Sequence, residues 1–333
     1  MREPDDYANR LTESQKERAT LTSRFGDWQP EMWFTYHLYY RAPDFLGPDF
    51  CNQAAIPYVA AEASYAPRRA TGPWAAAHET SANALRTAAL LFAMTARDEE
   101  GLSCCPELTV PIVRLAPFID SIPDALEKSA MPISGDQQPT RLVTVAMMRK
   151  GDKLDSYRIL AEALEMVGDL SWTLTIIGDG RSRPCVEQAF RKLESQRLTR
   201  RITWLGQLDA PSVHEQLRVS DVFVWPGRGE AYGLAYLEAE AHGLPIVAMD
   251  SAGVSSVVEH RVSGLLSPDG DIAAYADGLR QLILGHTLKE MLGRGAREKI
   301  LRGHSSQAAT RVIQDAFALL RSPSAISGVS VAS

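Results

Sequence analysis

Two glutamates, Glu230 and Glu238, lie eight positions apart and are the acidic residues best placed to do chemistry. An apolar run at 222–225 and a glycine-rich loop precede Glu230, and a helical pattern that contains Glu238 follows it. A second apolar run begins at Leu244, so the order is strand, loop, helix and strand, the unit of a parallel sheet. Carboxylates in such a loop and helix can accept hydrogen bonds from the hydroxyl groups of a ligand.

The face of this helix on which Glu238 lies determines whether its carboxylate must be paired. Leu234, Leu237 and Ala241 recur at helical spacing and predict the buried stripe. Glu238 falls one turn after Leu234, inside the stripe, whereas Glu240 points away from it. A carboxylate in an apolar stripe costs free energy unless it is paired, so we expect either a protein partner or a ligand to satisfy Glu238.

Two cations, Arg149 and Lys153, lie in a loop between an apolar run at 141–148 and a helical pattern at 154–167. The N-terminus of a helix carries unpaired backbone N–H groups, and cations beside it make a site for an anion. Considered by itself, the loop fits a solvated basic surface better than a binding site. The loop supports a binding site only in combination with the loops described next.

Glycines stand at two further strand ends and before the helix that holds Glu238. Glycine allows a ligand to approach the backbone closely, and the first turn of a helix offers unpaired donors. Each glycine is a weak signal alone. These residues are Gly178, Gly206 and Gly233, the last followed by Leu234.

The four loops all follow expected strands, and ligands of open parallel sheets bind beyond the carboxyl ends of the strands. The cations and the helix N-terminus would hold a diphosphate, while the carboxylates would accept hydrogen bonds from sugar and ribose hydroxyl groups. The combination therefore suits a sugar nucleotide.

The elements that must position these residues fall into two expected α/β domains. Strands and helices alternate regularly over 141–321, which predicts a C-terminal domain with a doubly wound parallel sheet. Residues 1–120 are expected to form a partial N-terminal Rossmann-like domain. The stretch 121–140, rich in Pro, Ser and Asp, is the expected linker, and the tail 322–333 is expected to be disordered.

The first domain gives a less regular pattern of elements. Short apolar runs predict strands at 32–36, 56–60 and 108–115, and a run of small and apolar residues predicts a helix at 84–95.

Composition argues against several classes of protein. The 333 residues carry a net charge of −6, which argues against nonspecific nucleic-acid binding because neutralising phosphates needs a basic surface. The four cysteines do not show the spacing of a zinc site. The charged N-terminus does not resemble a signal peptide, and no apolar stretch is long enough to span a bilayer.

One block resembles the signature of the retaining glycosyltransferases of family four. Residues 230–239 read Glu-Ala-Tyr-Gly-Leu-Ala-Tyr-Leu-Glu-Ala, and Gly-Leu-Pro-Ile-Val-Ala follows at 243–248. The segments 176–180, 202–206 and 220–226 also occur in the order that the family shows. The resemblance covers residues from 141 to about 321, and it implies the GT-B fold of two Rossmann-like parallel-sheet domains.

The resemblance implies a catalytic set of three residues. Arg149 and Lys153 would neutralise the diphosphate leaving group, and Glu230 would contact the transferred sugar. Such enzymes usually need no divalent metal, because the cations and a helix N-terminus stabilise the leaving group. No cofactor is therefore expected beyond the nucleotide-sugar donor.

The remaining implied residues bind the donor. Glu238 would contact the ribose hydroxyl groups, and the backbone N–H groups of Gly233 and Leu234 would face phosphate or sugar. Gly178 and Gly206 would let the backbone approach the nucleoside.

The N-terminal part departs from the family. The family's opening strand and glycine-rich turn are not found in residues 1–30, so we expect a shortened first domain. The family often has a histidine after the strand that matches 57–60, whereas this chain has Glu62 in the segment 61–65. Either Glu62 or Tyr65 could face the sugar, and His37 could point into the cleft, although a surface histidine or a satisfied core histidine is the commoner case.

These observations predict a hexosyltransferase that moves sugar from a UDP- or GDP-sugar to an acceptor hydroxyl with retention of configuration. The acceptor would be a glycan, a lipid-linked molecule or a small molecule. The location would be cytoplasmic, with a peripheral position at the inner membrane face left open. The alternative is a truncated, catalytically weak or inactive remnant that binds a nucleotide or a protein partner. An epimerase with the same fold ranks last, because the first domain shows no convincing acid/base set.

Overall fold

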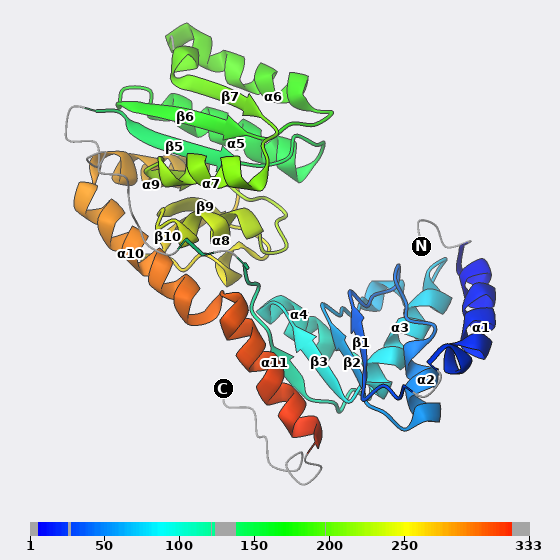
Figure 1. Ribbon diagram of the computed structural model, residues 1–333. Helices are drawn as coiled ribbons and strands as arrows, with labels where there is room; N and C mark the ends of the chain where they lie inside the picture. The colour runs from blue at the N-terminus through cyan, green and yellow to red at the C-terminus, as the bar shows by residue number, and fades with distance from the viewer. Residues whose placement is uncertain (1–5, 26–27, 121, 124–137, 197, 322–333) are drawn as a thin grey trace. The chain divides into compact units, whose positions relative to one another are not determined.

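The computed structural model describes residues 6–25, 28–120, 122–123, 138–196 and 198–321. The chain divides into two compact units, drawn in Figure 1. The N-terminal unit comprises residues 1–116 together with 310–333, and the C-terminal unit comprises residues 117–309. The division assigns 310–321 to the first unit, whereas the sequence analysis places these residues with the second.

The N-terminal unit contains a four-stranded parallel sheet in the order β1-β2-β3-β4. Every residue of the two central strands is buried, as expected for a parallel sheet that is covered on both faces. Its elements are α1 (Asp6–Phe25), β1 (Trp33–Tyr36), α2 (Gly47–Ala54), β2 (Tyr58–Ala61), α3 (Ala75–Thr87), β3 (Leu90–Ala93), α4 (Ala96–Ser103) and β4 (Ile112–Arg114).

The sequence-based reading of this unit is partly wrong. The expected helix at 84–95 is instead the end of α3, a break, and the buried strand β3. A short apolar run without polar spacing fits a buried strand as well as a helix, and here the strand is formed. The helix α1 over Asp6–Phe25 was also missed, because its sequence is strongly polar. The strand expected at 108–115 is limited to β4.

The C-terminal unit contains a six-stranded parallel sheet in the order β10-β9-β8-β5-β6-β7. Figure 1 shows helices on both sides of this sheet. α5 packs against α6 and α9, whereas α8 packs against α10. The elements are β5 (Thr140–Val145), α5 (Asp152–Met166), β6 (Trp172–Ile177), α6 (Arg183–Phe190), β7 (Ile202–Gly206), α7 (Ala210–Arg218), β8 (Val222–Val224), α8 (Leu234–Ala241), β9 (Ile246–Asp250), β10 (Gly264–Pro268), α9 (Ile272–Leu284), α10 (His286–Gly303) and α11 (Ser306–Arg321), which extends into the N-terminal unit.

This strand order reverses its direction of growth between β5 and β8. The chain adds β6 and β7 on one side of β5, then returns to add β8, β9 and β10 on the other. Arg141 fixes the join, because its guanidinium lies 2.8 Å from the Asp221 carboxylate while its backbone N–H donates to the same side chain. The predicted doubly wound sheet is confirmed, and its switch point lies between β5 and β8.

Some sequence-based assignments lie outside the described residues. The expected linker at 121–140 falls largely on residues 121 and 124–137, and the expected disordered tail is 322–333. Thr140 belongs to β5 rather than to a linker. In the part of the chain that the structure describes, no helix is long and apolar enough to cross a membrane.

Candidate functional site

The switch point brings two of the predicted loops to neighbouring strand ends. The loop after β5 contains Arg149 and leads to α5, whose second residue is Lys153. The loop after β8 contains Glu230 and leads to α8. Because β5 and β8 are paired in parallel, both loops leave the same edge of the sheet. Ligands of doubly wound folds bind at this kind of crevice.

Lys153 and Glu230 form an ion pair across the switch point. Both side chains are largely buried, with exposed fractions of 14% and 13%. The indole N–H of Trp225 donates to the same Glu230 oxygen at 3.0 Å, and the Lys153 ammonium lies 5.5 Å from the centre of the Trp225 ring. Charges with restricted access to water are costly unless paired, so each of these groups compensates the other in this state.

Trp225 is a site residue that sequence reasoning missed. It directly follows β8, and in the sequence it stands out only as the last residue of an apolar run. Its ring packs edge-on against Tyr157 at 4.8 Å, and its carbonyl accepts a 3.0 Å hydrogen bond from the Tyr236 hydroxyl group. An indole N–H at a strand end, five residues before a glutamate, was the available signal.

Arg149 is not brought into contact with this pair. Its side chain is exposed, and among the described residues it forms no hydrogen bond or ion pair. The structure therefore joins Lys153 to Glu230 and leaves Arg149 in the adjacent loop.

Gly178 and its neighbours bring the β6 loop against the β5 loop. A Cβ on Gly178 would lie 2.0 Å from the carbonyl oxygen of Ala146, and the glycine has a φ of 135°. The Met148 N–H donates to the Asp179 carbonyl at 2.9 Å across the same contact. Gly206, at the end of β7, accepts from the Gly178 N–H at 2.7 Å. The two glycines therefore pack adjacent strand ends tightly, whatever they do for a ligand.

Gly233 and Leu234 begin α8. Gly233 is the residue before the helix, with a φ of 68°, and a Cβ there would meet the Tyr236 ring at 2.7 Å. Leu234 is 48% exposed. The backbone donors of the first turn of α8 therefore lie at an accessible helix N-terminus.

The predicted orientation of α8 is wrong. Leu234 is exposed and Glu238 is half-buried, whereas Glu240 is completely buried. Glu240 forms a 2.7 Å ion pair with Lys299 of α10, and burial raises the pKa of Glu240 to about 7 against the attraction of that lysine. Sequence spacing alone placed the wrong carboxylate in the core, because nothing local shows that α10 supplies a cation.

Glu238 instead lies one turn after Leu234 on the accessible side of α8. Burial raises its pKa, and the nearby His214 opposes that shift. Among the described residues Glu238 forms no hydrogen bond or ion pair, so its carboxylate is available to a ligand.

A histidine pair lies beside this glutamate. His214 of α7 and His242, at the end of α8, are joined by a 2.9 Å contact between Nδ1 and Nε2. Burial lowers the pKa of His242 to about 4, and the charge of His214 adds to the effect. One ring must therefore donate while the other accepts, with His242 neutral near pH 7.

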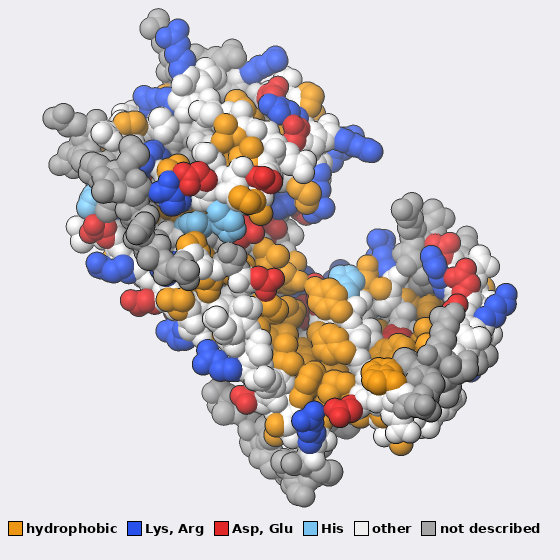
Figure 2. All heavy atoms as spheres, viewed as in Figure 1, with side chains coloured by type: hydrophobic (Ala, Val, Ile, Leu, Met, Phe, Trp, Pro, Cys, Tyr) orange, Lys and Arg blue, Asp and Glu red, His pale blue; other side chains and the backbone are white. Residues whose placement is uncertain are grey.

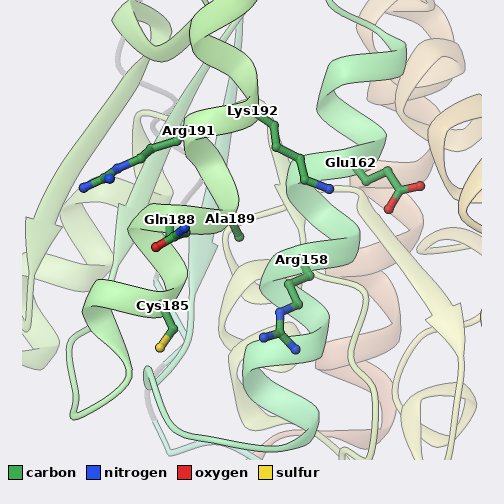
Figure 3. A pocket seen from close by; sticks show the side chains of 7 residues that line it. All are labelled: Arg158, Glu162, Cys185, Gln188, Ala189, Arg191 and Lys192. Carbon is green, nitrogen blue, oxygen red and sulfur yellow. The ribbon is translucent and has the colours of Figure 1, made fainter.

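Other surface features do not involve the predicted residues. A cavity of about 730 Å³ lies beside α5 and α6. Figure 3 shows the side chains that line it, those of Arg158, Glu162, Cys185, Gln188, Ala189, Arg191 and Lys192. Figure 2 shows acidic and basic side chains interspersed on the visible face. No group of three or more metal-binding side chains is found in the described ranges of the chain.

The segment that holds β5, α5, β8 and α8 resembles a known family in sequence. The family model for glycosyl transferases group 1 matches residues 139–284. The matched segment contains both loops of the switch point and the whole of α8.

Curated relatives agree with this match. The chain is 38% identical over 127 residues to a D-inositol 3-phosphate glycosyltransferase of Jonesia denitrificans, an alignment that covers 38% of this chain and 30% of the relative. It is 27% identical over 166 residues to an N-acetyl-alpha-D-glucosaminyl L-malate synthase of Bacillus anthracis, which covers 50% of this chain and 42% of the relative. The matched segments thus span less than half the length of these relatives.

Solved structures share the fold over nearly the whole chain. A sucrose-phosphate synthase from Thermosynechococcus elongatus superposes with a TM-score of 0.68 and 16% identity, covering 94% of this chain and 79% of that one. The HepE protein of Anabaena, in complex with UDP-glucose, superposes with a TM-score of 0.63 and 17% identity, covering 91% and 81%. The predicted fold, two parallel-sheet α/β domains of the GT-B type, is confirmed.

We predict that the tight contact at Gly178 makes substitution there costly. Gly178→Ala should lower the free energy of unfolding by about 3 kcal/mol or more, because its Cβ meets the Ala146 backbone. Gly270→Ala is the matched control, since Gly270 also has a positive φ, of 81°, but open space around it. It should cost about 1–2 kcal/mol, the strain of φ alone. Equal losses in urea unfolding would show that the contact is not rigid.

The buried His242 should make stability fall in acid. The unfolded chain binds a proton at this ring near pH 6.5, whereas the folded protein binds it only near pH 4. The free energy of unfolding should therefore decrease as the pH is lowered from 6.5 to 4. Urea unfolding of His242→Gln should show a smaller acid loss than wild type, and comparing the two proteins cancels the opposite effect of Glu240.

The control for this measurement is His286→Gln. The His286 side chain is exposed, so this variant should keep the full acid loss. Parallel pH profiles for all three proteins would contradict the assignment.

Proposed function

We propose that this chain transfers a hexose from a UDP- or GDP-sugar to an acceptor hydroxyl group with retention of configuration. The observation that carries the proposal is the Lys153–Glu230 pair at the β5–β8 switch point, next to the N-terminus of α8. It lies inside the segment that matches the glycosyl transferases group 1 family model. HepE, which shares the fold, is known in complex with UDP and with UDP-glucose.

The ion pair has a simple chemical use. The diphosphate of a bound donor would attract the Lys153 ammonium more strongly than one carboxylate does, because it carries more negative charge. Glu230 would then accept hydrogen bonds from the transferred sugar, while Trp225 continues to orient it. The lysine would stabilise the charge that develops on the leaving phosphate, where a fixed cation lowers the barrier most.

The remaining predicted residues have supporting roles in the proposal. Arg149 is exposed and without a partner among the described residues, so it is available to a second phosphate charge. The first turn of α8 supplies backbone donors from Gly233 and Leu234. Glu238, half-buried on the same helix, would accept from the ribose hydroxyl groups. We propose that no metal is needed, since these cations and donors act on the diphosphate directly.

Titration calorimetry with UDP, GDP and their glucose and mannose conjugates tests the proposal. Wild type should bind at least one of these nucleotides, and Lys153→Ala should weaken binding at least about tenfold, because a phosphate contact is lost. Arg158→Ala is the matched control, since it removes a cation from the same helix. The Arg158 side chain is 59% exposed and is paired with Asp155. This variant should bind like wild type.

The possible outcomes separate the two candidate functions. Absence of binding by every nucleotide would overturn the proposal, as would equal affinity in Lys153→Ala and wild type. Nucleotide binding without release of UDP or GDP from the bound donor would favour the inactive remnant.

A further inference from the structure

Two titratable side chains meet at the equivalent edge of the N-terminal sheet. His37 directly follows β1 and Glu62 directly follows β2, and these strands pair in parallel with Tyr36 opposite Ala61. The His37 N–H donates to the Ala61 carbonyl at 2.9 Å. Beyond the last paired residues, Nδ1 of His37 lies 3.1 Å from a Glu62 carboxylate oxygen.

Both residues hold a backbone conformation that side chains disfavour. His37 has a φ of 69° and Glu62 a φ of 51°, although neither is glycine. In the left-handed region Cβ crowds the following carbonyl, so a glycine would be easier to accommodate at either position. Two such residues at adjacent strand ends, joined by their side chains, are typical of a site where strain is kept for function.

The contact with Glu62 fixes how His37 can act. Nδ1 faces the carboxylate, so it carries the proton and Nε2 is left as an acceptor when the ring is neutral. The His37 side chain is 51% exposed, and Nε2 has no hydrogen-bond partner among the residues that the structure describes. An oriented imidazole with an accessible acceptor can take a hydrogen bond from a hydroxyl group.

A cavity of about 520 Å³ opens beside this imidazole within the same unit. Phe34, Tyr36 and His37 line it from the β1 side, and Arg10 and Glu13 line it from α1. Phe34 is 45% and Tyr36 63% exposed. Aromatic faces beside a guanidinium and a carboxylate suit a ring that carries several hydroxyl groups, because the faces cover its carbon atoms and the polar groups bind its oxygens.

The carboxylate of Asp44, which also lines this cavity, has a structural role. It accepts hydrogen bonds from the Tyr58 hydroxyl group at 3.1 Å and from the backbone N–H groups of Leu46 and Gly47. Its lone pairs are thus committed to the chain itself. His37 also lines the cavity from the β1 side, and its side chain is exposed.

We propose that His37 binds a hydroxyl group of a carbohydrate acceptor in this cavity, and that Glu62 is the residue that positions it. That the bound ring is the acceptor rests on the proposed function, whereas the binding of a polyhydroxylated ring does not. In this proposal Nε2 of His37 accepts the hydrogen bond, and the carboxylate of Glu62 orients the imidazole ring.

The imidazole tautomer is the first readout. In ¹⁵N spectra the neutral His37 ring should be protonated at Nδ1, and Glu62→Gln should lose this preference. His260 is an internal control of opposite sign, because its Nδ1 accepts a 3.0 Å hydrogen bond from the Leu266 N–H and the proton must lie on Nε2. The same tautomer for His37 with and without the Glu62 carboxylate would overturn the positioning role.

Sugar binding is the second readout, measured by saturation-transfer NMR titrations with the methyl α-glycosides of glucose, galactose and mannose. At least one should bind wild type, and His37→Gly and Glu62→Gln should weaken it about tenfold, the loss expected from one oriented hydrogen bond. His37→Gly also relieves the backbone strain, so its melting temperature should equal or exceed that of wild type. Weaker binding by a more stable variant cannot be attributed to unfolding.

Glu79→Gln is the matched control in the same unit, because Glu79 is exposed and paired with Arg86. Equal affinity in wild type and His37→Gly, or no transfer to any glycoside, would overturn the inference. UDP titration of the same variants separates this test from that of the proposed function. If wild type does not bind UDP, the donor site alone is rejected. If the variants bind both UDP and the glycosides as wild type does, the acceptor site alone is rejected.

Discussion

The ion pair between Lys153 and Glu230 is the interaction on which the functional account depends. Two charges with exposed fractions near one seventh cannot each remain unpaired, so the protein holds them together beside Trp225. In that arrangement the lysine lies next to a helix N-terminus and is paired rather than exposed to water. A ligand that brings more negative charge than one carboxylate can take the lysine, and it frees the glutamate at the same time.

The rest of the C-terminal unit makes this pair possible. Arg141 and Asp221 fix β5 against β8 at the beginning of both strands, so the loops at their carboxyl ends must meet. Gly178 lets the neighbouring β6 loop press against the backbone of Ala146, which gives the β5 loop a tightly packed support. The buried Glu240–Lys299 pair holds α8 on α10 and so leaves Glu238 on the accessible side of that helix.

Sequence reasoning succeeded where the signal was local. The doubly wound sheet predicted for 141–321 is confirmed, because its strands and helices have clear periods and clear stops. The proximity of Lys153 and Glu230 followed from the rule for parallel sheets. The reading failed where a distant segment decided the outcome. Lys299, 59 residues from Glu240, determines which glutamate of α8 is buried, and only the paired strand ends reveal the contact between His37 and Glu62.

A crystal structure of the protein soaked with UDP tests the central claim most directly. The account predicts that the diphosphate lies within hydrogen-bond distance of the Lys153 ammonium and of the first backbone N–H groups of α8, with Glu230 no longer bound to the lysine alone. A nucleotide seated elsewhere on the C-terminal sheet, with the Lys153–Glu230 pair intact, would contradict it.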